Sequence, residues 1–468
     1  MKKILIALMT AVCLQMSAKV EMPKMFGDGM VLQREAAVNL WGTARKNAKV
    51  SITTLWDGKT YAAKADKDGR WQQTVQTPEA GGPYTITLSD GEPLVLKDIL
   101  IGEVWICSGQ SNMEMQMKGF KGQPVEGAIN DVLQSRDEDL RMFTVKRNSQ
   151  FAPVDTVSGA WRKATPQTTR DFSATAYYFG RMLRRVLDVP VGLIVAAWGG
   201  SACEAWMTAD WLRAFPDAKI PQTPDDIKSK NRPPTVLYNG MLHPLIGYTM
   251  SGVIWYQGED NVPRYATYAD MLSTMIRGWR SEWRQGDFPF YYCQIAPYDY
   301  DLIDWHVNSA LLREQQARVE TMVPNSAMAV LMDAGLEYGI HPRKKSVAGE
   351  RLAMLALSKT YGIGGIPEFA RYEGMEIQGD TAVVRFERSK EWVYFDRGTT
   401  SQLFEIAGAD RVFHPADKVW IERNRVYVKS DQVKKPVAVR YAFRNWADGD
   451  LFHDGLPVSS FRTDDWEE

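Results

Sequence analysis

Val104-Trp-Ile-Cys-Ser-Gly-Gln-Ser-Asn-Met-Glu114 begins as an apolar run, stops at Gly109 and leaves Ser111 in a turn. The run extends back to Ile99 and is rich in Ile, Val and Trp, a pattern that predicts a buried strand leading into a tight turn. Open α/β sheets bind ligands beyond the carboxyl ends of their strands, so Ser111 lies where a nucleophile would be useful. The N–H groups after it would be free to bind an oxyanion. Serine is also common in ordinary turns, so this stretch alone leaves a catalytic and a structural interpretation open.

The region from about residue 99 to 362 alternates apolar runs with segments of helical spacing. The predicted strands are Ile99 to Cys107, Val191 to Trp198, Met250 to Tyr256, Phe288 to Ile295 and Ala327 to Met332. Predicted helices cover Ala174 to Leu187, the segment in which Leu272, Ile276, Trp279 and Trp283 share one face, and Arg343 to Tyr361. This alternation predicts an α/β fold with a parallel sheet of about five strands between layers of helices.

The two ends of the chain show period-two alternation instead, as in Val50/Ile52 near the start and Val426/Val428 near the end. We therefore expect an N-terminal β domain over residues 19–98, an α/β domain over residues 99–365 and a C-terminal β segment over residues 366–468. The pattern does not say whether the two β segments form one domain. No residues in the N-terminal segment converge on chemistry, so we interpret it as scaffold.

Residues 1–18 predict a signal peptide. Lys2-Lys3 is followed by the apolar residues Ile4 to Leu14 and by Ala18 at a cleavage position, so we expect a protein that is exported to the periplasm or secreted. No later run reaches the roughly 18 apolar residues of a membrane span, and none is expected. The mature chain keeps three cysteines, Cys107, Cys203 and Cys293, in or beside apolar strands, which favours buried free thiols over disulfides.

The composition narrows the class of partner. A net charge of -1 gives no electrostatic footprint for nucleic acid or anionic membranes. The 16 Trp and 19 Tyr residues suit sugar ligands, although most of them are expected in the core.

Three later strand ends carry polar or glycine-rich sequences. The second strand ends in Gly199-Gly200, where a backbone N–H could approach a ligand closely, and the third ends in Gln257-Gly-Glu-Asp-Asn261, which offers amide donors and a carboxylate. The fifth is followed by His341, which could serve as the base for Ser111 if it lies within hydrogen-bond reach, roughly 2.6 to 3.2 Å. Each of the three places also has a non-catalytic interpretation: a plain turn, a solvated acidic loop and a structural histidine. The occurrence of suitable chemical groups at several strand ends together nevertheless favours a functional site.

Five ordered motifs carry a resemblance to a known family. They are Gly109-Gln-Ser-Asn-Met113, Trp198-Gly-Gly-Ser-Ala-Cys-Glu-Ala-Trp206, Tyr238-Asn-Gly-Met-Leu-His-Pro-Leu245, Gly252-Val-Ile-Trp-Tyr-Gln-Gly-Glu259 and Ile340-His-Pro342. Together they resemble the sialate O-acetylesterase family, a branch of the SGNH-type hydrolases. The likeness extends to Pro23 to Arg34 near the start and to Gly455 to Phe461 near the end, and so covers nearly the whole mature chain.

The resemblance implies a serine esterase that removes O-acetyl groups from sugars without a metal or other cofactor. In it Ser111 would be the nucleophile and His341 the general base. The oxyanion would be held by the N–H of Ser111, by Gly199 or Gly200, and by a side-chain donor such as Gln257. Further polar residues of the motifs are predicted to bind the substrate, namely Gln110, Asn112, Asn239 and Asn261.

The third member of the triad is where the chain departs from many SGNH hydrolases. They place an aspartate three residues before the histidine, whereas this chain has Tyr338 there, which is neutral at pH 7. The resemblance makes Glu259 the first choice for a group that orients His341, with Asp333 and Glu337 as reserves.

The leading hypothesis is therefore an exported carbohydrate O-acetylesterase acting on O-acetylated sialic acid. An acetylxylan or other plant-polysaccharide esterase is the nearest alternative, and a non-catalytic carbohydrate-binding protein is the alternative of another class. The loops Gly119 to Asp131, Pro221 to Pro234 and Tyr298 to Val307 would set the substrate, and Tyr298, Tyr300 and Trp305 are candidates for stacking on a sugar ring. The sequence does not fix the glycan, the acetyl position or the oligomeric state.

Overall fold

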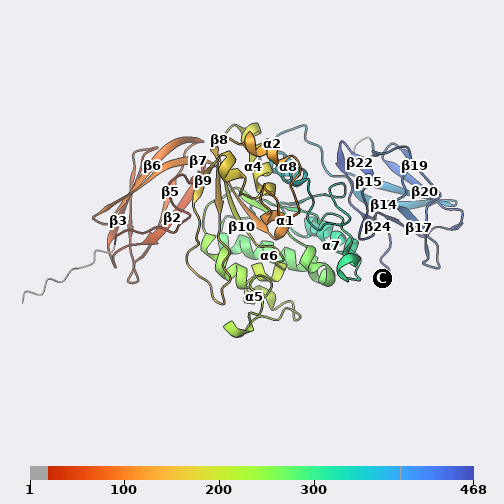
Figure 1. The fold of residues 1–468 in the computed structure, drawn as a ribbon, viewed down its shortest axis with the longest axis horizontal. Helices are drawn as coiled ribbons and strands as arrows, with labels where there is room; N and C mark the ends of the chain where they lie inside the picture. The colour runs from red at the N-terminus through yellow and green to blue at the C-terminus, as the bar shows by residue number, and fades with distance from the viewer. Residues whose placement is uncertain (1–18, 390–391, 468) are drawn as a thin grey trace, which may run out of the picture.

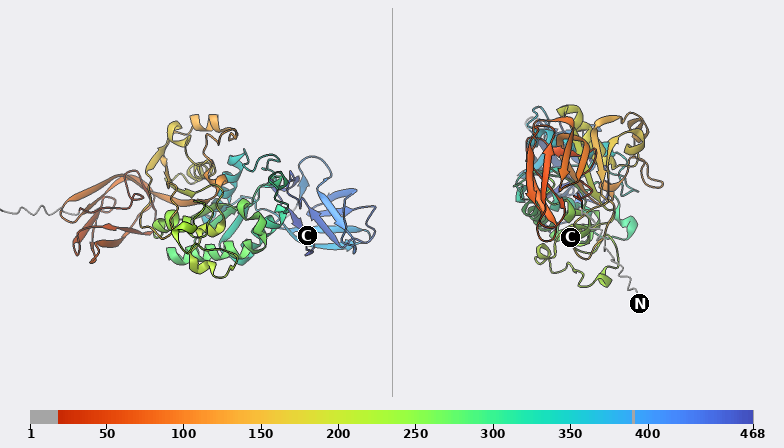
Figure 2. Two further views of the ribbon diagram at one scale, coloured as in Figure 1. Left: turned by 60° about the horizontal axis from the view of Figure 1, so that its bottom comes forward. Right: turned by 90° about the vertical axis from the view of Figure 1, so that its left-hand side faces the viewer.

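The computed structural model describes residues 19–389 and 392–467, so the predicted signal peptide lies outside the described residues. The chain forms an elongated molecule with three regions in a row (Figure 1). Antiparallel strands from the N-terminal part lie at one end, an α/β region occupies the middle, and strands from the C-terminal part lie at the other end. The left-hand view of Figure 2 again shows the two β regions at opposite ends, so they do not pack into one domain.

The central sheet contains all five predicted strands and two more. Its order is β13 (Ser326–Ala329), β12 (Phe290–Cys293), β11 (Gly252–Tyr256), β7 (Pro93–Gly109), β10 (Val191–Ala197), β8 (Asp137–Thr144) and β9 (Trp161–Ala164). Every neighbouring pair is parallel except β8 and β9, which are antiparallel. The carboxyl ends of the parallel strands therefore share one edge of the sheet.

The two additional strands lacked a clear apolar pattern. β8 begins with three acidic residues and carries Arg141 in its interior. That arginine is 2% exposed because its guanidinium pairs with Asp98 at 2.9 Å and donates to the Gly29 carbonyl at 3.1 Å. A long-range ion pair thus allows a charged residue in a buried strand, which periodicity does not reveal.

Helices cover both faces of the sheet. Trp105 of β7 and Trp255 of β11 point to opposite faces, because Trp105 lies opposite Gly252, three residues before Trp255. Trp105 packs against Phe179 of α4 (Ala174–Leu187), and Trp255 packs against Trp279 of α6 (Tyr268–Trp283). α8 (Lys345–Leu355), which a π-helical turn continues to residue 360, packs on α4, and α7 (Ser309–Met322) packs beside α6 (Figure 1). The mixed α/β layering predicted for the middle of the chain is confirmed.

The remaining α-helices are short, and are α1 (Ser111–Glu114), α2 (Ala128–Leu133), α3 (Pro166–Thr169) and α5 (Ala209–Leu212).

One strand joins the N-terminal region to the central sheet. β7 pairs with β6 (Gly81–Ser89) and β1 (Val31–Gln33) along its first half and with β10 and β11 along its second half. The predicted boundary between residues 98 and 99 therefore falls inside a continuous strand. Midway along β7, the buried carboxylate of Glu103 accepts hydrogen bonds from Arg34 at 2.6 Å, from Tyr361 at 2.8 Å and from Ser251. These contacts tie both regions to one point of the strand.

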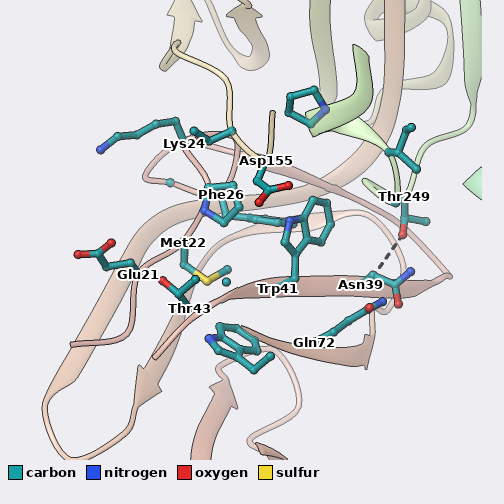
Figure 3. A pocket seen from close by; sticks show the side chains of 18 of the residues that line it. Glu21, Met22, Lys24, Phe26, Asn39, Trp41, Thr43, Gln72, Asp155 and Thr249 are labelled. Atoms are coloured by element: carbon teal, nitrogen blue, oxygen red, sulfur yellow. Dashed lines mark hydrogen bonds between the residues drawn. The ribbon is translucent and has the colours of Figure 1, made fainter. Parts of the chain in front are cut away.

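The N-terminal region leaves a large hollow where it meets the α/β region. Its other strands are β2 (Ala37–Thr43), β3 (Lys49–Thr54), β4 (Thr60–Lys64) and β5 (Arg70–Gln76). The hollow has a volume of about 2080 Å³, and Figure 3 shows Trp41, Asn39, Asp155 and Thr249 around it. Thr249 precedes β11, so the hollow lies toward the amino ends of the central strands, away from the edge that carries Ser111.

The C-terminal region consists of small antiparallel sheets. Its strands are β14 (Arg371–Gln378), β15 (Thr381–Glu387), β16 (Tyr394–Phe395), β17 (Phe404–Ala407), β18 (Phe413–Pro415), β19 (Lys418–Glu422), β20 (Arg425–Lys429), β21 (Ala438–Tyr441), β22 (Leu451–His453), β23 (Leu456–Pro457) and β24 (Phe461–Arg462). The region is fixed to α7 by Arg313, a fully buried residue that donates to Ser460 Oγ at 3.0 Å and to the Arg444 carbonyl at 2.6 Å. A buried guanidinium requires such partners, so this contact has a defined geometry.

Two further predictions concern the cysteines and membrane-spanning segments. Cys107, Cys203 and Cys293 are buried and unpaired, which confirms the prediction of free thiols. Burial raises the pKa of the Cys107 and Cys203 thiols well above the ordinary value, so these thiols stay protonated. Among the described residues, no helix is long and apolar enough to cross a membrane.

Candidate active site

Ser111 is the first residue of α1, directly beyond the carboxyl end of β7. The chain leaves the sheet at Gly109, which has φ 137°, and the N–H of Gln110 still bonds to the carbonyl of Tyr256 at 2.9 Å. A Cβ at Gly109 would lie 2.2 Å from that same carbonyl oxygen. Only glycine fits this close approach of two strands, and the turn that presents Ser111 follows from it.

The first turn of α1 leaves two N–H groups free. The N–H groups of Met113 and Glu114 bond to the Gln110 carbonyl at 2.9 Å. Those of Ser111 and Asn112 donate no hydrogen bond to any residue in the described ranges. Free N–H groups beside a nucleophile are suitable donors for the negative oxygen of a tetrahedral intermediate.

The turn at Gly199 and Gly200 lies against Ser111. A Cβ added to Gly199 would be 3.1 Å from the Cβ of Ser111. The Gly199 N–H donates to the Glu114 carboxylate at 2.8 Å, so this candidate oxyanion donor is already occupied. Gly200 has φ 68°, and its N–H has no partner in the part of the chain that the structure describes. Of the two glycines, Gly200 is therefore the one with a free donor.

The amide of Gln257 is fully occupied within the protein. Its nitrogen donates to the Ser201 carbonyl at 3.1 Å and to Asn261 Oδ1 at 2.7 Å, and its oxygen accepts from Tyr268 at 2.9 Å. The side chain is completely buried. Gln257 therefore joins two loops beneath the site, and the structure does not bring a free hydrogen of this amide to Ser111.

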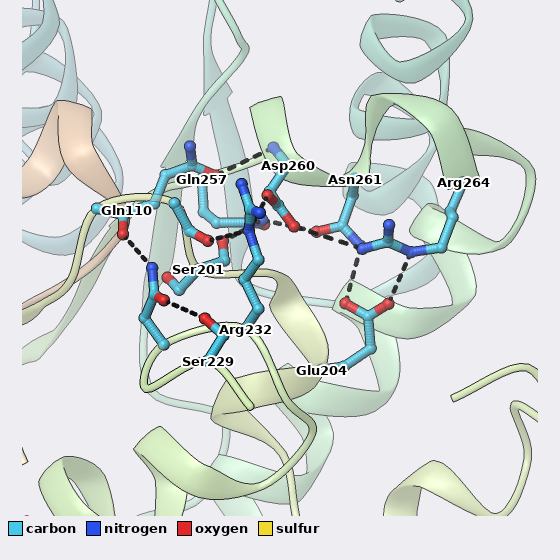
Figure 4. Close-up of polar contacts among 12 residues, drawn as sticks. Gln110, Ser201, Glu204, Ser229, Arg232, Gln257, Asp260, Asn261 and Arg264 are labelled. Atoms are coloured by element: carbon cyan, nitrogen blue, oxygen red, sulfur yellow. Dashed lines mark hydrogen bonds and ion pairs between the residues drawn. The ribbon is translucent and has the colours of Figure 1, made fainter. Parts of the chain in front are cut away.

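Three of the predicted substrate-binding side chains also hold loops. Asn261 Oδ1 accepts the Cys203 N–H at 2.9 Å, while its nitrogen donates to Glu204 at 2.9 Å (Figure 4). Asn239 donates to two backbone carbonyls of the segment around residue 150, at 3.2 and 2.9 Å. Gln110 Oε1 accepts the N–H groups of residues 258 and 260 at 3.3 and 3.4 Å. All three are at most 6% exposed.

The loop predicted between Pro221 and Pro234 does reach the glycine turn. Asn231 donates to the Gly199 carbonyl at 2.6 Å, and Arg232 Nε donates to the Gly200 carbonyl at 3.3 Å. Arg232 also pairs with Asp260 at 3.1 Å, and Arg264 pairs with Glu204 at 3.1 Å (Figure 4). This loop is thus part of the surroundings of Ser111.

His341 lies in the loop before α8, and a neutral amide contacts its ring. Its Nδ1 is 2.6 Å from Gln123 Oε1, and the ring of Phe120 packs edge-on at 5.2 Å. With Gln123 Oε1 as acceptor, Nδ1 carries the proton and Nε2 keeps its lone pair. Burial, followed by the charge of Lys345, lowers the pKa of His341 to about 4, so the imidazole is neutral at pH 7.

Asn112 connects α1 to the loop that carries His341. Its amide nitrogen donates to the Ile340 carbonyl at 3.2 Å and to Glu259 at 2.5 Å, and its oxygen accepts from Lys345 Nζ at 2.5 Å. Asn112 is 1% exposed, so it cannot contact a substrate sugar and acts instead as a brace between Ser111 and His341.

Two buried ionisable side chains lie behind this brace. Glu259 is 3% exposed and Lys345 is 1% exposed. Burial raises the pKa of Glu259, whereas burial lowers the pKa of Lys345 to about 7. Glu259 is therefore joined to His341 through Asn112 and Ile340, with no direct hydrogen bond between the two among the described residues.

The two reserve carboxylates are placed differently. Asp333 forms a two-point ion pair with Arg351 of α8 at 2.6 and 2.7 Å. Glu337 lies next to Tyr338, which is 76% exposed. The backbone carbonyl of Glu337 accepts a hydrogen bond from the N–H of Asp299. Neither carboxylate forms a hydrogen bond with His341 in the described residues, so Gln123 is the side chain that the structure places at Nδ1.

Comparison with known proteins assigns the chain to a family. The sequence profile of a carbohydrate esterase family, sialic acid-specific acetylesterase, matches residues 101–358. The human sialate O-acetylesterase is 30% identical over 72% of this chain and 70% of its own length, and that of Pongo abelii is 30% identical over 90% and 86%. The chain belongs to this esterase family.

The fold of the esterase agrees with that of a solved relative. The crystal structure of a carbohydrate acetylesterase from Xanthomonas citri has a TM-score of 0.88 and 36% identity, and the match covers 96% of this chain and 100% of that chain. As a member of the family, the protein is a carboxylic-ester hydrolase.

Two residues that the sequence did not single out contribute to the site of the esterase. Gln123 lies in the loop from Gly119 to Asp131, which was predicted to contact substrate, but an exposed glutamine carries no signal of its own. Lys345 stands one turn after His341, at the start of α8. The sequence could have indicated its role in one way. A lysine on the inner face of a helix that packs on a sheet is expected to be buried and to have a polar partner.

Two aromatic residues of the loop from Tyr298 to Val307 are not free to stack on a sugar of the esterase substrate. Tyr300 is fully buried, and its ring stacks on Trp305 at 5.9 Å and meets Tyr298 edge-on at 5.0 Å. Tyr298 is 8% exposed. The prediction for Tyr298 and Tyr300 was wrong because the three rings pack on one another, which buries more apolar area than exposure on a loop would.

Proposed function

We propose that this esterase is an exported serine O-acetylesterase that removes acetyl groups from O-acetylated sialic acid. The observation that carries the proposal is the geometry around Ser111: a nucleophile at the carboxyl end of β7, two free N–H groups at α1 and a histidine loop held to that helix by Asn112. Membership of the family supports the reaction. The predicted signal peptide over residues 1–18 supports export.

The reaction would begin with a proton transfer. His341 Nε2 accepts the proton of the Ser111 hydroxyl while Oγ attacks the acetyl carbonyl carbon. The carbonyl oxygen becomes negative and is held by the N–H groups of Ser111 and Gly200, since Gly199 and Gln257 are committed elsewhere. The protonated imidazole then gives its proton to the departing sugar oxygen, which leaves an acetyl group on Ser111.

Water completes the cycle. His341 takes a proton from a water molecule, the resulting hydroxide attacks the acetyl-enzyme, and acetate leaves as Ser111 regains its proton. In this scheme Gln123 keeps the imidazole in the required tautomer through Nδ1. The buried pair of Glu259 and Lys345 acts through Asn112 and contacts neither the substrate nor the imidazole directly.

The deciding experiment is acetate release by purified residues 19–468 from O-acetylated sialic acid and, in parallel, from acetylated xylan. Ser111→Ala is the matched control, because it removes one hydroxyl that makes no hydrogen bond within the described protein. Faster release from sialic acid that disappears in Ser111→Ala supports the proposal. Release from xylan alone would replace the substrate, and activity that survives in Ser111→Ala would overturn the mechanism.

A further inference from the structure

Arg147 follows β8 and stands at the same edge of the sheet as the nucleophile. The N–H of Val145 still bonds to the carbonyl of Val195 in β10 at 2.9 Å, so the chain keeps its register two residues before Arg147. β10 ends two residues later at Ala197 and leads into Trp198 and Gly199. Because these strands are parallel, Arg147 and Trp198 emerge beside each other at the edge where β7 delivers Ser111.

The guanidinium of Arg147 is held by a hydrogen bond from its Nε and by packing of its planar face on the ring of Trp198. Nε donates to Glu114 Oε1 at 2.6 Å, and the other oxygen of Glu114 accepts the Gly199 N–H at 2.8 Å. The guanidinium carbon lies 5.4 Å from the centre of the Trp198 ring. Glu114 is the last residue of α1, so the arginine is anchored to the helix that carries Ser111.

The outer edge of this guanidinium is available to a ligand. Nη1 and Nη2 have no hydrogen-bond partner in residues 19–389 and 392–467, and the Arg147 side chain is 53% exposed whereas that of Glu114 is 17% exposed. A carboxylate binds best to two parallel N–H groups of arginine, which is the pair left open here. The Trp198 ring beside it is half-buried, which leaves part of its apolar surface to contact a sugar.

A second arginine strengthens the positive field beside the glycine turn. Arg232 is held in the same way, through Nε, by Asp260 at 3.1 Å and by the Gly200 carbonyl at 3.3 Å. Its side chain is 61% exposed while that of Asp260 is 10% exposed. In both pairs the cation faces solvent and the anion is withdrawn, so the surroundings of Ser111 present positive charge although each pair is neutral overall.

We propose that Arg147 binds the carboxylate of an anionic sugar ester and thereby makes this esterase prefer acetylated acidic sugars to neutral ones. The inference rests on the proposed function, since it names the part of the substrate that the same site recognises. A purely structural role would be limited to Nε, which holds Glu114 and through it the Gly199 turn. Such a role would affect every acetyl ester equally.

The test compares two substrates that differ in one charge. Acetate release is measured as kcat/KM on O-acetylated sialic acid and on its methyl ester at the sugar carboxylate, for wild type, Arg147→Gln and Arg147→Lys. Hydrogen bonds from Arg147 to the sugar carboxylate would be lost in the methyl ester. From the usual strength of hydrogen bonds to a charged group, we expect the wild type to cleave the free acid with a kcat/KM about 10- to 100-fold higher. Arg147→Gln should lose at least tenfold more on the free acid than on the methyl ester, mainly through KM, and Arg147→Lys should recover part of the preference.

The control is Arg70→Gln in β5, which removes the same charge from an exposed ion pair with Asp155 and should change neither substrate. An equal loss on both substrates in Arg147→Gln, or a wild type without preference, would overturn the subsite. Cleavage of p-nitrophenyl acetate that depends on Ser111 separates the two proposals, because it can persist when the preference is absent. If no ester is cleaved, the proposed function fails, and calorimetry with sialic acid decides the subsite: equal affinity of wild type and Arg147→Gln would overturn it.

Discussion

Replacing Asn112 by leucine should destabilise the α/β region and slow the reaction at the same time. Asn112 provides the side-chain hydrogen bond both to Glu259 and to Lys345, and the second carboxylate oxygen of Glu259 has no partner among the described residues. Asn112→Leu would leave two buried ionisable side chains without these bonds. Each hydrogen bond to a charged group contributes about 1.5–3 kcal/mol, so we expect a loss of about 3–6 kcal/mol in the free energy of unfolding. That is a large part of the roughly 5–15 kcal/mol of a typical domain.

The rate should fall for a separate reason. The same substitution removes the hydrogen bond to the Ile340 carbonyl, which holds the His341 loop beside α1. Thermal and urea unfolding followed by circular dichroism measure the first effect, and kcat for acetate release at a temperature well below the transition measures the second. Asn130→Leu, on the exposed face of α2, is the matched control and should change stability by no more than about 0.5 kcal/mol.

A triple variant separates the two effects. Asn112→Leu combined with Glu259→Leu and Lys345→Met replaces the whole buried polar cluster, and apolar replacement of a complete set of buried ionisable groups is often neutral or stabilising. Most of the lost stability should return, while kcat stays low because the Ile340 carbonyl remains without its partner. An Asn112→Leu protein within about 1 kcal/mol of wild type, or a triple variant as unstable as the single one, would refute this reasoning.

Three further predictions concern the histidine and the glycine turn. The acid limb of kcat/KM should lie near pH 4 rather than near the ordinary histidine value of 6.5, because a lowered pKa keeps His341 neutral above about 4; a pH–rate profile with a limb near 6.5 would contradict this. Gln123→Leu should lower kcat roughly 10- to 100-fold with little change in KM, since the imidazole loses the acceptor at Nδ1; Gln123→Glu should retain more activity, and equal losses in the two variants would argue against the tautomer role. Gly199→Ala should lower kcat about 10- to 100-fold because the new Cβ would stand 3.1 Å from that of Ser111, and a crystal structure of the variant would reveal whether the serine moves.

The sequence predicted the elements that are set by local pattern. Each of the five apolar runs became a strand of the central sheet, and the turn after the first of them carries Ser111. The α/β layering followed because strands buried on both faces need helices on both sides. β8 was missed because Arg141 breaks its pattern, and the partner that permits a buried arginine is Asp98, 43 residues away.

The site was harder to predict because a sequence does not reveal which polar groups are satisfied inside the protein. Gln257 and Asn261 stand at a strand end as expected, yet their hydrogens are taken by neighbouring loops. Asn112 was expected to meet the substrate and is instead buried between Glu259 and Lys345. Gln123 reaches His341 across 218 residues, a pairing that no local signal encodes.

The course of β7 has a consequence for how the protein can be divided. The strand begins at Pro93 among the N-terminal sheets and ends at Gly109, two residues before Ser111. A cut at residue 98 or 99 would sever it and separate residues 99–102 of the strand from their partners in β1 and β6. The N-terminal region therefore cannot be exchanged by recombination as a separate unit, because the strand that sets the position of Ser111 begins within it. A domain exchange between relatives that keeps Ser111 in position would have to include the N-terminal sheets together with the α/β region.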